Sequence, residues 1–299
     1  MKPLTQQTMF GGHWTQKKLE VLSEYLRAYT RIFEKNARAR FFQTTYVDAF
    51  AGTGVIPRPE PGPFISSFFP QRAEAEEEFR KGSVKRALEL VPPFDHYVFV
   101  EKDAEKCEEL RALSQEFPKR DIQIVNADAN SALLDWCEQM DTERERAVVF
   151  LDPFGASVEW RVIEALADTQ AVDLWILFPY AAINRMLVSG RMPPKAWAKR
   201  LTRIFGTAQW KEEFYETNSW HSLMEPGAMV DIVSKVADLR RITDFFVKRL
   251  RAKFAGVAKP GFLRNSKGVL FVLLFAAGNA RGARPAIKIA DHLLERMNL

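Results

Sequence analysis

The stretch Tyr46-Val-Asp-Ala-Phe-Ala-Gly-Thr-Gly54 gives the clearest indication of the fold class, because it is a short apolar run that ends in a glycine turn. Three further stretches follow the same plan and end in carboxylates or a turn: Val98-Phe-Val-Glu-Lys-Asp103, Asn126-Ala-Asp-Ala-Asn130 and Val148-Val-Phe-Leu-Asp-Pro-Phe-Gly155. Their length and β-branching predict strands. Since open α/β sheets bind ligands outside the carboxyl ends of their strands, these stretches predict four walls of one nucleotide-like site.

Strands and helices are expected to alternate along the chain. Strands are predicted over 45–50, 97–101, 122–126, 147–152, 172–178, 254–258 and 268–276. Helices are predicted over 15–35 and near 83–91, 104–116, 130–139, 158–167 and 285–297. This alternation predicts a Rossmann-like α/β fold with a mostly parallel, seven-stranded sheet whose last strand is antiparallel. The last two strands lie close enough in sequence to form that antiparallel hairpin.

The first helix is expected to be amphipathic, with Thr15 as its N-cap. Its inward-facing residues recur at helical spacing: Leu19, Leu22, Leu26, Tyr29 and Phe33. Two later segments interrupt the alternation. Residues 55–81 start Pro-rich and fit a loop over the ligand site, whereas 181–250 are predicted to form a mostly helical insertion that binds substrate or a partner. The ligand-binding domain then comprises 1–180 and 251–299.

The glycine loop favours a ligand without phosphates. Gly52 and Gly54 let the backbone approach a ligand where a Cβ would collide. A dinucleotide-binding loop needs a third glycine, but that position is Pro57, which has no N–H for a pyrophosphate. Glu101 is expected to accept hydrogen bonds from ribose hydroxyls, or else to be a solvated strand end. Asp128 is expected to accept from an adenine amine, or else to cap the next helix.

The candidate catalytic motif is Asp152-Pro153-Phe154-Gly155. Pro153 holds Asp152 extended and removes one N–H donor. The Asp152 carboxylate and a nearby carbonyl can then accept the hydrogens of an exocyclic base amine, while Phe154 stacks on the base. The alternative is that Asp152 caps the following helix and Phe154 belongs to the core. The candidate cofactor-binding residues are Asp48, Phe50, Ala51, Gly52, Thr53, Gly54, Glu101, Lys102, Asp128 and Ala129.

Charge is unevenly distributed along the chain, whose net charge is +5. Residues 185–299 hold 21 Lys or Arg against 9 Asp or Glu, whereas 1–184 hold 22 against 29. Basic residues that cluster beside aromatic ones predict a nucleic-acid surface, although a solvated face is the alternative. The candidate substrate-binding residues are Tyr180, Arg185, Lys199, Arg200 and Arg203.

The cysteines argue against a disulfide scaffold, and the histidines argue against a metal site. Cys107 and Cys137 lie in helix-like segments and predict free thiols in a reducing, cytoplasmic compartment. The four histidines show no metal-ligand spacing, so no metal is expected. Residues 1–20 lack the apolar region of a signal peptide, and the longest apolar run, 269–277, is too short to span a membrane.

The order of glycine loop, two acids and Asp-Pro-aromatic is similar to that of class I S-adenosylmethionine (SAM) dependent methyltransferases. The chain further resembles the three-Cys-motif partner proteins, a bacterial and phage-associated family with this fold. The motifs that carry this resemblance span most of the chain: His13-Trp-Thr-Gln-Lys17, Tyr46 to Gly54, Gly82-Ser83 with Arg86-Ala-Leu88, Phe99 to Asp103, Leu151 to Gly155, Asp173 to Tyr180, and Ile204-Phe-Gly206 with Trp210. The resemblance implies SAM as cofactor and a separate Cys-rich protein as partner.

Two functions remain open at this point. The first is a SAM-dependent N-methyltransferase that acts on a base of RNA or DNA. The Asp-Pro-Phe-Gly turn resembles that of tRNA guanine-N2 methyltransferases, which implies an exocyclic amine as the methyl acceptor. The second is a non-catalytic binding module that keeps the methyltransferase fold and acts with the Cys-rich partner.

Overall fold

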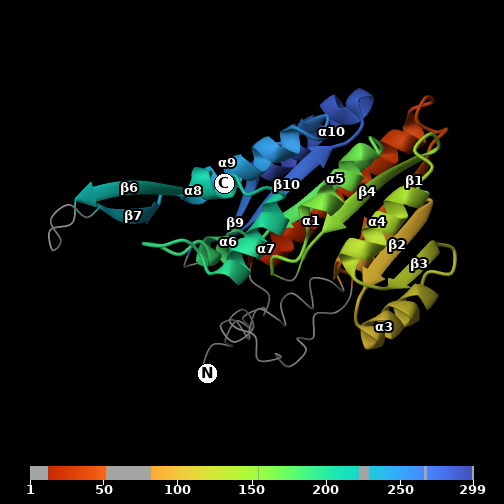
Figure 1. Cartoon of the computed structure of the whole chain (residues 1–299). Helices are drawn as coiled ribbons and strands as arrows, with labels where there is room; N and C mark the ends of the chain where they lie inside the picture. The colour runs from red at the N-terminus through yellow and green to blue at the C-terminus, as the bar shows by residue number, and fades with distance from the viewer. Residues whose placement is uncertain (1–12, 52–81, 154, 222–228, 266–267, 298–299) are drawn as a thin grey trace, which may run out of the picture.

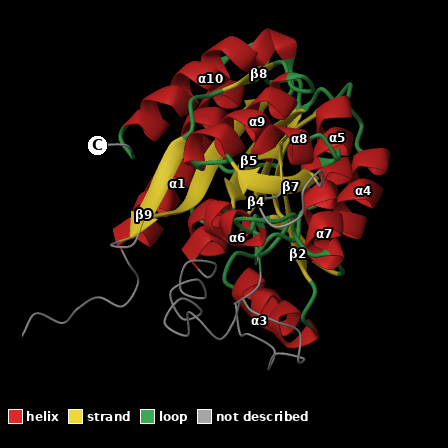
Figure 2. Cartoon of the chain, turned by 60° about the vertical axis from the view of Figure 1, so that its left-hand side comes forward, coloured by secondary structure: helices red, strands yellow, loops and turns green. Residues whose placement is uncertain are grey.

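The computed structural model describes residues 13–51, 82–153, 155–221, 229–265 and 268–297. Within them an eight-stranded sheet lies between two layers of helices (Figures 1 and 2). The strands are β1 (Gln43–Asp48), β2 (His96–Glu101), β3 (Asp121–Asn126), β4 (Glu145–Leu151), β5 (Val172–Phe178), β8 (Gly256–Val257), β9 (Gly261–Asn265) and β10 (Gly268–Ala277). Their order is β3-β2-β1-β4-β5-β10-β8, and β9 also pairs with β10. The predicted Rossmann-like fold is confirmed.

The first five strands are parallel, and β10 runs antiparallel to β5, as predicted. The strand order reverses between β1 and β4, because β2 and β3 extend the sheet on one side and β4 and β5 on the other. The sheet has one strand more than the seven expected. The hairpin partner of β10 is β9, while the predicted strand 254–258 is reduced to the two residues of β8. Pro260, which has no N–H for a ladder, separates β8 from β9.

Alternate residues of each strand face the two helical layers, as expected for a sheet buried on both sides. Tyr46, Val148 and Trp175 pack against α1 (His13–Lys35) and α10 (Ala280–Glu295) in one core cluster. The helical stretch 82–88 and α3 (Ala104–Gln115) contribute to the same cluster. On the opposite face, the second cluster is covered by α4 (Ala129–Gln139) and α5 (Trp160–Asp168).

Two helix starts differ from the prediction. The inward face of α1 is as expected, but the helix already begins at His13, so Thr15 lies inside its first turn and is not the N-cap. Helix α10 begins at Ala280, because the Asn279 side chain accepts from the N–H groups of Arg281 and Gly282. Pro285 therefore lies inside α10 and does not start it.

The segment 181–250 contains more than the helices predicted for it. It includes α6 (Tyr180–Met186), α7 (Lys195–Phe205), α8 (Trp210–Phe214) and α9 (Leu239–Arg251). Between α8 and α9, however, β6 (Tyr215–His221) and β7 (Met229–Lys235) form an antiparallel hairpin that reaches away from the main sheet in Figure 1. The sequence of β6 is polar and lacks a clear apolar alternation, so it gave no strand signal.

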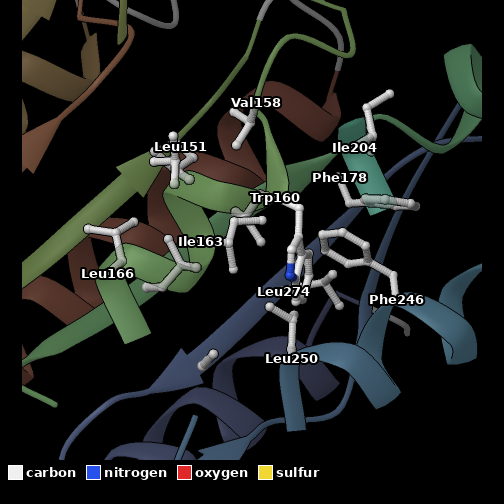
Figure 3. Close-up of a cluster of buried hydrophobic side chains, with 14 of the residues drawn as sticks. Leu151, Val158, Trp160, Ile163, Leu166, Phe178, Ile204, Phe246, Leu250 and Leu274 are labelled. Carbon is white, nitrogen blue, oxygen red and sulfur yellow. The ribbon is translucent and has the colours of Figure 1, made fainter. Parts of the chain in front are cut away.

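The helices of this segment share a core with the sheet. Figure 3 shows Ile204 of α7 and Phe246 and Leu250 of α9 around Trp160, together with Phe178 of β5. The rings of Phe178 and Phe246 lie 4.4 Å apart. Helix α7 is thereby fixed beside the carboxyl end of β5. The expected loop insertion at 55–81 lies outside the described residues.

Candidate functional site

Two buried acidic residues lie at neighbouring strand ends where the strand order reverses. Asp48 ends β1, and Asp152 follows directly after β4. The two strands are paired in a register that sets Asp48 opposite Phe150, two residues before Asp152. In open α/β sheets the ligand crevice lies at this reversal, outside the carboxyl ends of the strands.

Asp152 forms a buried ion pair with Lys18 of α1. Lys18 Nζ donates to Asp152 Oδ2 over 2.8 Å, and the two side chains are only 1% and 8% exposed. Removing two charges from water is costly, so a buried pair is weak evidence for a stabilising role. The alternative that Asp152 caps the next helix is wrong, because α5 begins at Trp160 and its N-cap position is Glu159.

Asp48 is bonded on both of its oxygens. Oδ1 accepts from the Phe50 N–H over 3.1 Å, and Oδ2 accepts from the Ser83 hydroxyl over 3.1 Å. Burial raises the pKa of the neighbouring Tyr46 well above its usual value, and the charges of Asp48 and Asp152 raise it further. Both carboxylates therefore act on one buried ring at the reversal point.

Glu101 lies at the carboxyl end of the next strand, β2, where a tight turn leads into α3. One oxygen of its half-buried carboxylate, Oε1, accepts from the Asp103 N–H over 2.8 Å. The Asn126 amide donates to the main-chain carbonyls of Glu101 and Lys102 at 3.0 and 2.9 Å. The turn is thereby fixed, and the Lys102 side chain is exposed.

Asp128 caps α4, which is one of the two roles considered for it. Its Oδ1 accepts from the Asn130 N–H over 3.0 Å, while Ala129 is buried behind it. Asn130 in turn binds the loop after β4. It donates to the Ser157 carbonyl over 3.1 Å and accepts from the Glu159 N–H over 2.9 Å. The start of α4 therefore holds the loop that begins at Asp152.

The remaining predicted residues divide into three groups. Gly52, Thr53, Gly54 and Phe154 lie outside the described residues. Ala51 is buried and donates its N–H to the Val100 carbonyl, and Phe50 packs partly buried against the core. Pro153 and Gly155 are also buried. Gly155 has φ of +69°, a backbone conformation that favours glycine, so the turn after Asp152 requires this residue.

Among the five predicted substrate-binding residues, Arg200 and Arg203 contact the loop that follows Asp152. Arg200 Nε donates to the Ala156 carbonyl over 3.1 Å, and Arg203 lies 3.4 Å from the Glu159 carboxylate. Arg185 and Lys199 are exposed on α6 and α7. Tyr180 begins α6, and its pKa is raised by burial and then by Asp238.

Sequence reasoning missed Lys18, Ser83, Asn130 and Ser157. For Lys18 a signal existed, because it lies four residues before Leu22 and eight before Leu26 on the buried face of an amphipathic helix. A lysine on that face needs a buried partner. Ser83 and Asn130 lie within quoted motifs, but their partners are distant in sequence, and no local pattern indicates that the Ser157 hydroxyl is buried.

The described residues support the expectation of free thiols. Cys107 and Cys137 are both unpaired. Burial, followed by the charge of Glu138, raises the pKa of Cys137 to about 12, which keeps it protonated. In the same part of the chain, no cluster of three or more histidine, cysteine or acidic side chains could hold a metal ion. Nor does any helix described there have the length and apolarity to cross a membrane.

No family model matches the chain, and a search of curated proteins found no match. Solved structures match it at low similarity. Protein LPL1258 from Legionella pneumophila is 13% identical, with a TM-score of 0.39 over 81% of this chain and 93% of that one. An rRNA methylase from Streptococcus thermophilus is 8% identical, with a TM-score of 0.30 over 72% and 95%. TYW2 of M. jannaschii, solved in complex with AdoMet, is 10% identical, with a TM-score of 0.27 over 77% and 80%. At these scores the likenesses carry no functional argument.

Proposed function

We propose that this protein is a SAM-dependent methyltransferase that acts on an exocyclic amine of a nucleic-acid base. The observation that carries the proposal is the buried Lys18–Asp152 ion pair at the reversal of the strand order, with the buried Asp48 at the end of the neighbouring strand. Buried charged groups that lie together at a ligand-binding position, and that core packing does not require, are typical of functional sites. The antiparallel β10 next to β5 agrees with the methyltransferase-like fold expected from the sequence.

The residues along this edge of the sheet suit SAM. Its ribose and adenine offer hydroxyl and amine donors, and Glu101 and Asp128 place carboxylates after β2 and β3 to receive them. Both acids are at least partly accessible, whereas Asp48 and Asp152 are buried. This gradient favours contacts of Glu101 and Asp128 with the nucleoside, and of Asp48 and Asp152 with the reacting end.

When bound, SAM supplies a sulfonium-activated methyl group for in-line attack by the amine nitrogen. A conjugated amine is a weak nucleophile, so acceptors on its hydrogens assist attack. Asp152 is the acceptor in this proposal, and the proton released from the methylated amine passes to it or to water. Lys18 acts as a positioning residue, because its 2.8 Å contact fixes the orientation of the Asp152 carboxylate.

The finer identity is proposed from the sequence resemblance. The chain would belong with the three-Cys-motif partner proteins of bacteria and phages, and would work with a separate Cys-rich protein. Residues 1–180 and 251–299 would form the SAM-binding domain, and 181–250 the insertion for substrate or partner. The β6–β7 hairpin reaches away from the main sheet and suits this second role.

The test has two steps. Calorimetric titration of the full chain with SAM measures binding, and labelled SAM with total cellular RNA and DNA measures methyl transfer. Asp152→Asn should keep SAM affinity within a few-fold and lower transfer by roughly a hundred-fold or more. The matched control is Asp135→Asn on the exposed face of α4, which should change neither. If the folded wild-type chain fails to bind SAM, the proposal is wrong.

A second function is favoured by one observation. Because Lys18 already binds Asp152, the same pair also suits a non-catalytic module that keeps the site for structural reasons. In that case SAM can bind, but no methyl transfer occurs with RNA or DNA, with or without the Cys-rich partner. Methyl transfer that depends on Asp152 would exclude the non-catalytic module.

A further inference from the structure

A small cavity lies directly beside the loop that follows Asp152. It has a volume of about 180 Å³ and is lined by residues 156–159 of that loop and by Arg200, Arg203 and Ile204 of α7. The loop and the helix are far apart in sequence. Their contact is made by Arg200, whose Nε donates to the Ala156 carbonyl over 3.1 Å.

The walls of the cavity are rigid. Val158 and Ile204 belong to the buried cluster of Figure 3, and Asn130 holds the loop from the other side. Gly206 ends α7 with φ of +65°, and a Cβ there would lie 2.1 Å from the Trp160 ring. This close approach packs the end of α7 against the start of α5. The backbone of α7, which carries the two arginines, is therefore held in place beside the loop before any ligand binds.

Two arginines line the cavity, although burial and mutual repulsion disfavour the charge of Arg200. Arg200 is half-buried, and its pKa is lowered by burial and then by the neighbouring charge of Arg203. One acid also lines the cavity, Glu159, but it is already shared between Arg203 at 3.4 Å and Arg161 at 2.7 Å. A bound anion would relieve the repulsion between the arginines and offset the desolvation of Arg200.

Ser157 provides a second and independent sign of a ligand. Ser157 is one of the residues that line the cavity, and its Oγ is buried with no hydrogen-bond partner among the described residues. Buried hydroxyls without partners are rare because the lost hydration destabilises the fold. An acceptor oxygen in the cavity would complete this site.

We propose that the cavity binds a backbone phosphate of the nucleic-acid acceptor, next to the nucleotide whose base enters the site. Arg200 and Arg203 would supply charge-assisted hydrogen bonds, and the Ser157 hydroxyl a neutral one. The loop from Asp152 to Glu159 would then contact the base at one end and its phosphate at the other. The inference rests on the proposed nucleic-acid substrate, although it does not require SAM.

The experiment measures binding of a labelled single-stranded RNA and DNA oligonucleotide to the full chain by fluorescence anisotropy at several salt concentrations. Arg200→Gln and Arg203→Gln should each weaken binding roughly ten-fold. They should also reduce the slope of log affinity against log salt by about 0.7, the value for one phosphate of a single strand. The matched control is Arg284→Gln on the exposed face of α10, which removes the same charge outside the cavity.

Ser157→Ala separates binding from folding. Because it removes a buried hydroxyl without a partner, the variant should melt at the same or a higher temperature, yet bind the oligonucleotide a few-fold more weakly. If Ser157 had only a structural role, its substitution would not weaken oligonucleotide binding while leaving the melting temperature unchanged or higher.

Two outcomes would overturn the inference. The first is equal loss of affinity in Arg200→Gln and Arg284→Gln, which would mean that only overall charge matters. The second is that Arg200→Gln and Arg203→Gln leave the oligonucleotide affinity unchanged, while inorganic phosphate at millimolar concentration still binds at this cavity. That result would mean a site for free phosphate. Failure of SAM titration with these oligonucleotide effects intact would reject methyl transfer and leave the phosphate site standing.

Discussion

Helix α1 is fixed to the sheet by two polar contacts, one at each end of the strands, and they differ in kind. At the carboxyl end, Lys18 and Asp152 bury two opposite charges 2.8 Å apart. At the amino end, the Tyr25 hydroxyl donates to Asp173 Oδ2 over 2.7 Å, so that a neutral donor meets one carboxylate. We call these the carboxyl-end pair and the amino-end pair.

The difference indicates which contact serves a site. A tyrosine–aspartate hydrogen bond, with the Tyr25 ring packed 4.8 Å from Phe275 and 5.2 Å from Trp175, is explained by stability alone. A buried ion pair has no such advantage over apolar side chains of similar volume. It lies beside Asp48, at the strand ends where ligands bind, whereas the amino-end pair lies away from that crevice.

The largest effect is expected from breaking the carboxyl-end pair on one side. Lys18→Met leaves the Asp152 carboxylate buried without its cation, which should lower the free energy of unfolding by about 3–5 kcal/mol. Urea denaturation at neutral pH measures this loss.

The double variant Lys18→Met with Asp152→Asn removes both charges of the carboxyl-end pair. Without either charge the stability should return to within about 1 kcal/mol of wild type, while methyl transfer stays lost. Full recovery of methyl transfer in this double variant would contradict a functional role for the pair.

The second prediction concerns Glu101 at the same edge of the sheet. Glu101→Gln keeps an oxygen for the Asp103 N–H but loses the charge that would receive the ribose hydroxyls. We expect SAM affinity to fall by about 1.5–3 kcal/mol, roughly ten- to a hundred-fold, with little change in stability. Calorimetry checks this, with Glu105→Gln in the exposed first turn of α3 as the control. Unchanged affinity would remove Glu101 from the site.

Much of the fold could be predicted from the sequence, because the strands are short apolar runs and the helices are amphipathic. Strand 172–178 and the start of α3 at 104 were predicted to the residue, since a run that is apolar except for Asp173 and an Asp cap mark them locally. The β6–β7 hairpin was missed because pairing between polar strands depends on tertiary context.

The candidate site was predicted in outline only. An acid that follows a short apolar run is recognisable as the end of a strand, which is why Asp48, Glu101 and Asp152 could be placed at strand ends. Their partners were not, because the Lys18–Asp152 contact joins residues 134 positions apart and no local pattern encodes it. Ser157 is recognisable only when its hydroxyl is seen buried without a partner.

The third prediction uses the charge of the amino-end pair. Burial raises the pKa of Asp173 from 3.8 to about 6, although the Tyr25 hydroxyl and the Gly278 backbone oppose the shift. An acid whose folded pKa is raised stabilises the fold below its unfolded pKa, and this contribution is lost as pH rises from about 4 through 6.

Asp173→Asn should remove that dependence. Relative to this variant, the wild type should lose about 1–2 kcal/mol of stability between pH 4.5 and pH 7.5. Asp168→Asn, on the exposed end of α5, serves as the control. If the wild type and Asp173→Asn show parallel stability profiles over this range, Asp173 does not titrate as described.

The smallest effect is expected for Tyr25→Phe, which removes only the hydroxyl of the amino-end pair. The Asp173 carboxylate keeps the Gly278 backbone donor, so the loss should be about 1 kcal/mol at neutral pH. Tyr29→Phe, one turn along α1, is the matched control, since its ring is buried but its hydroxyl has no hydrogen-bond partner in the described part of the chain. That variant should change stability by a few tenths of a kcal/mol.

SAM affinity and methyl transfer should be unchanged in both tyrosine variants, because the amino-end pair lies away from the crevice. The opposite result would show that the two ends of α1 are coupled. If Tyr25→Phe lowers SAM affinity as much as Glu101→Gln does, then α1 transmits a change from one end of the sheet to the other. Lys18 would then act through the position of the whole helix, and its direct contact with Asp152 would no longer explain the effect of Lys18→Met on the site.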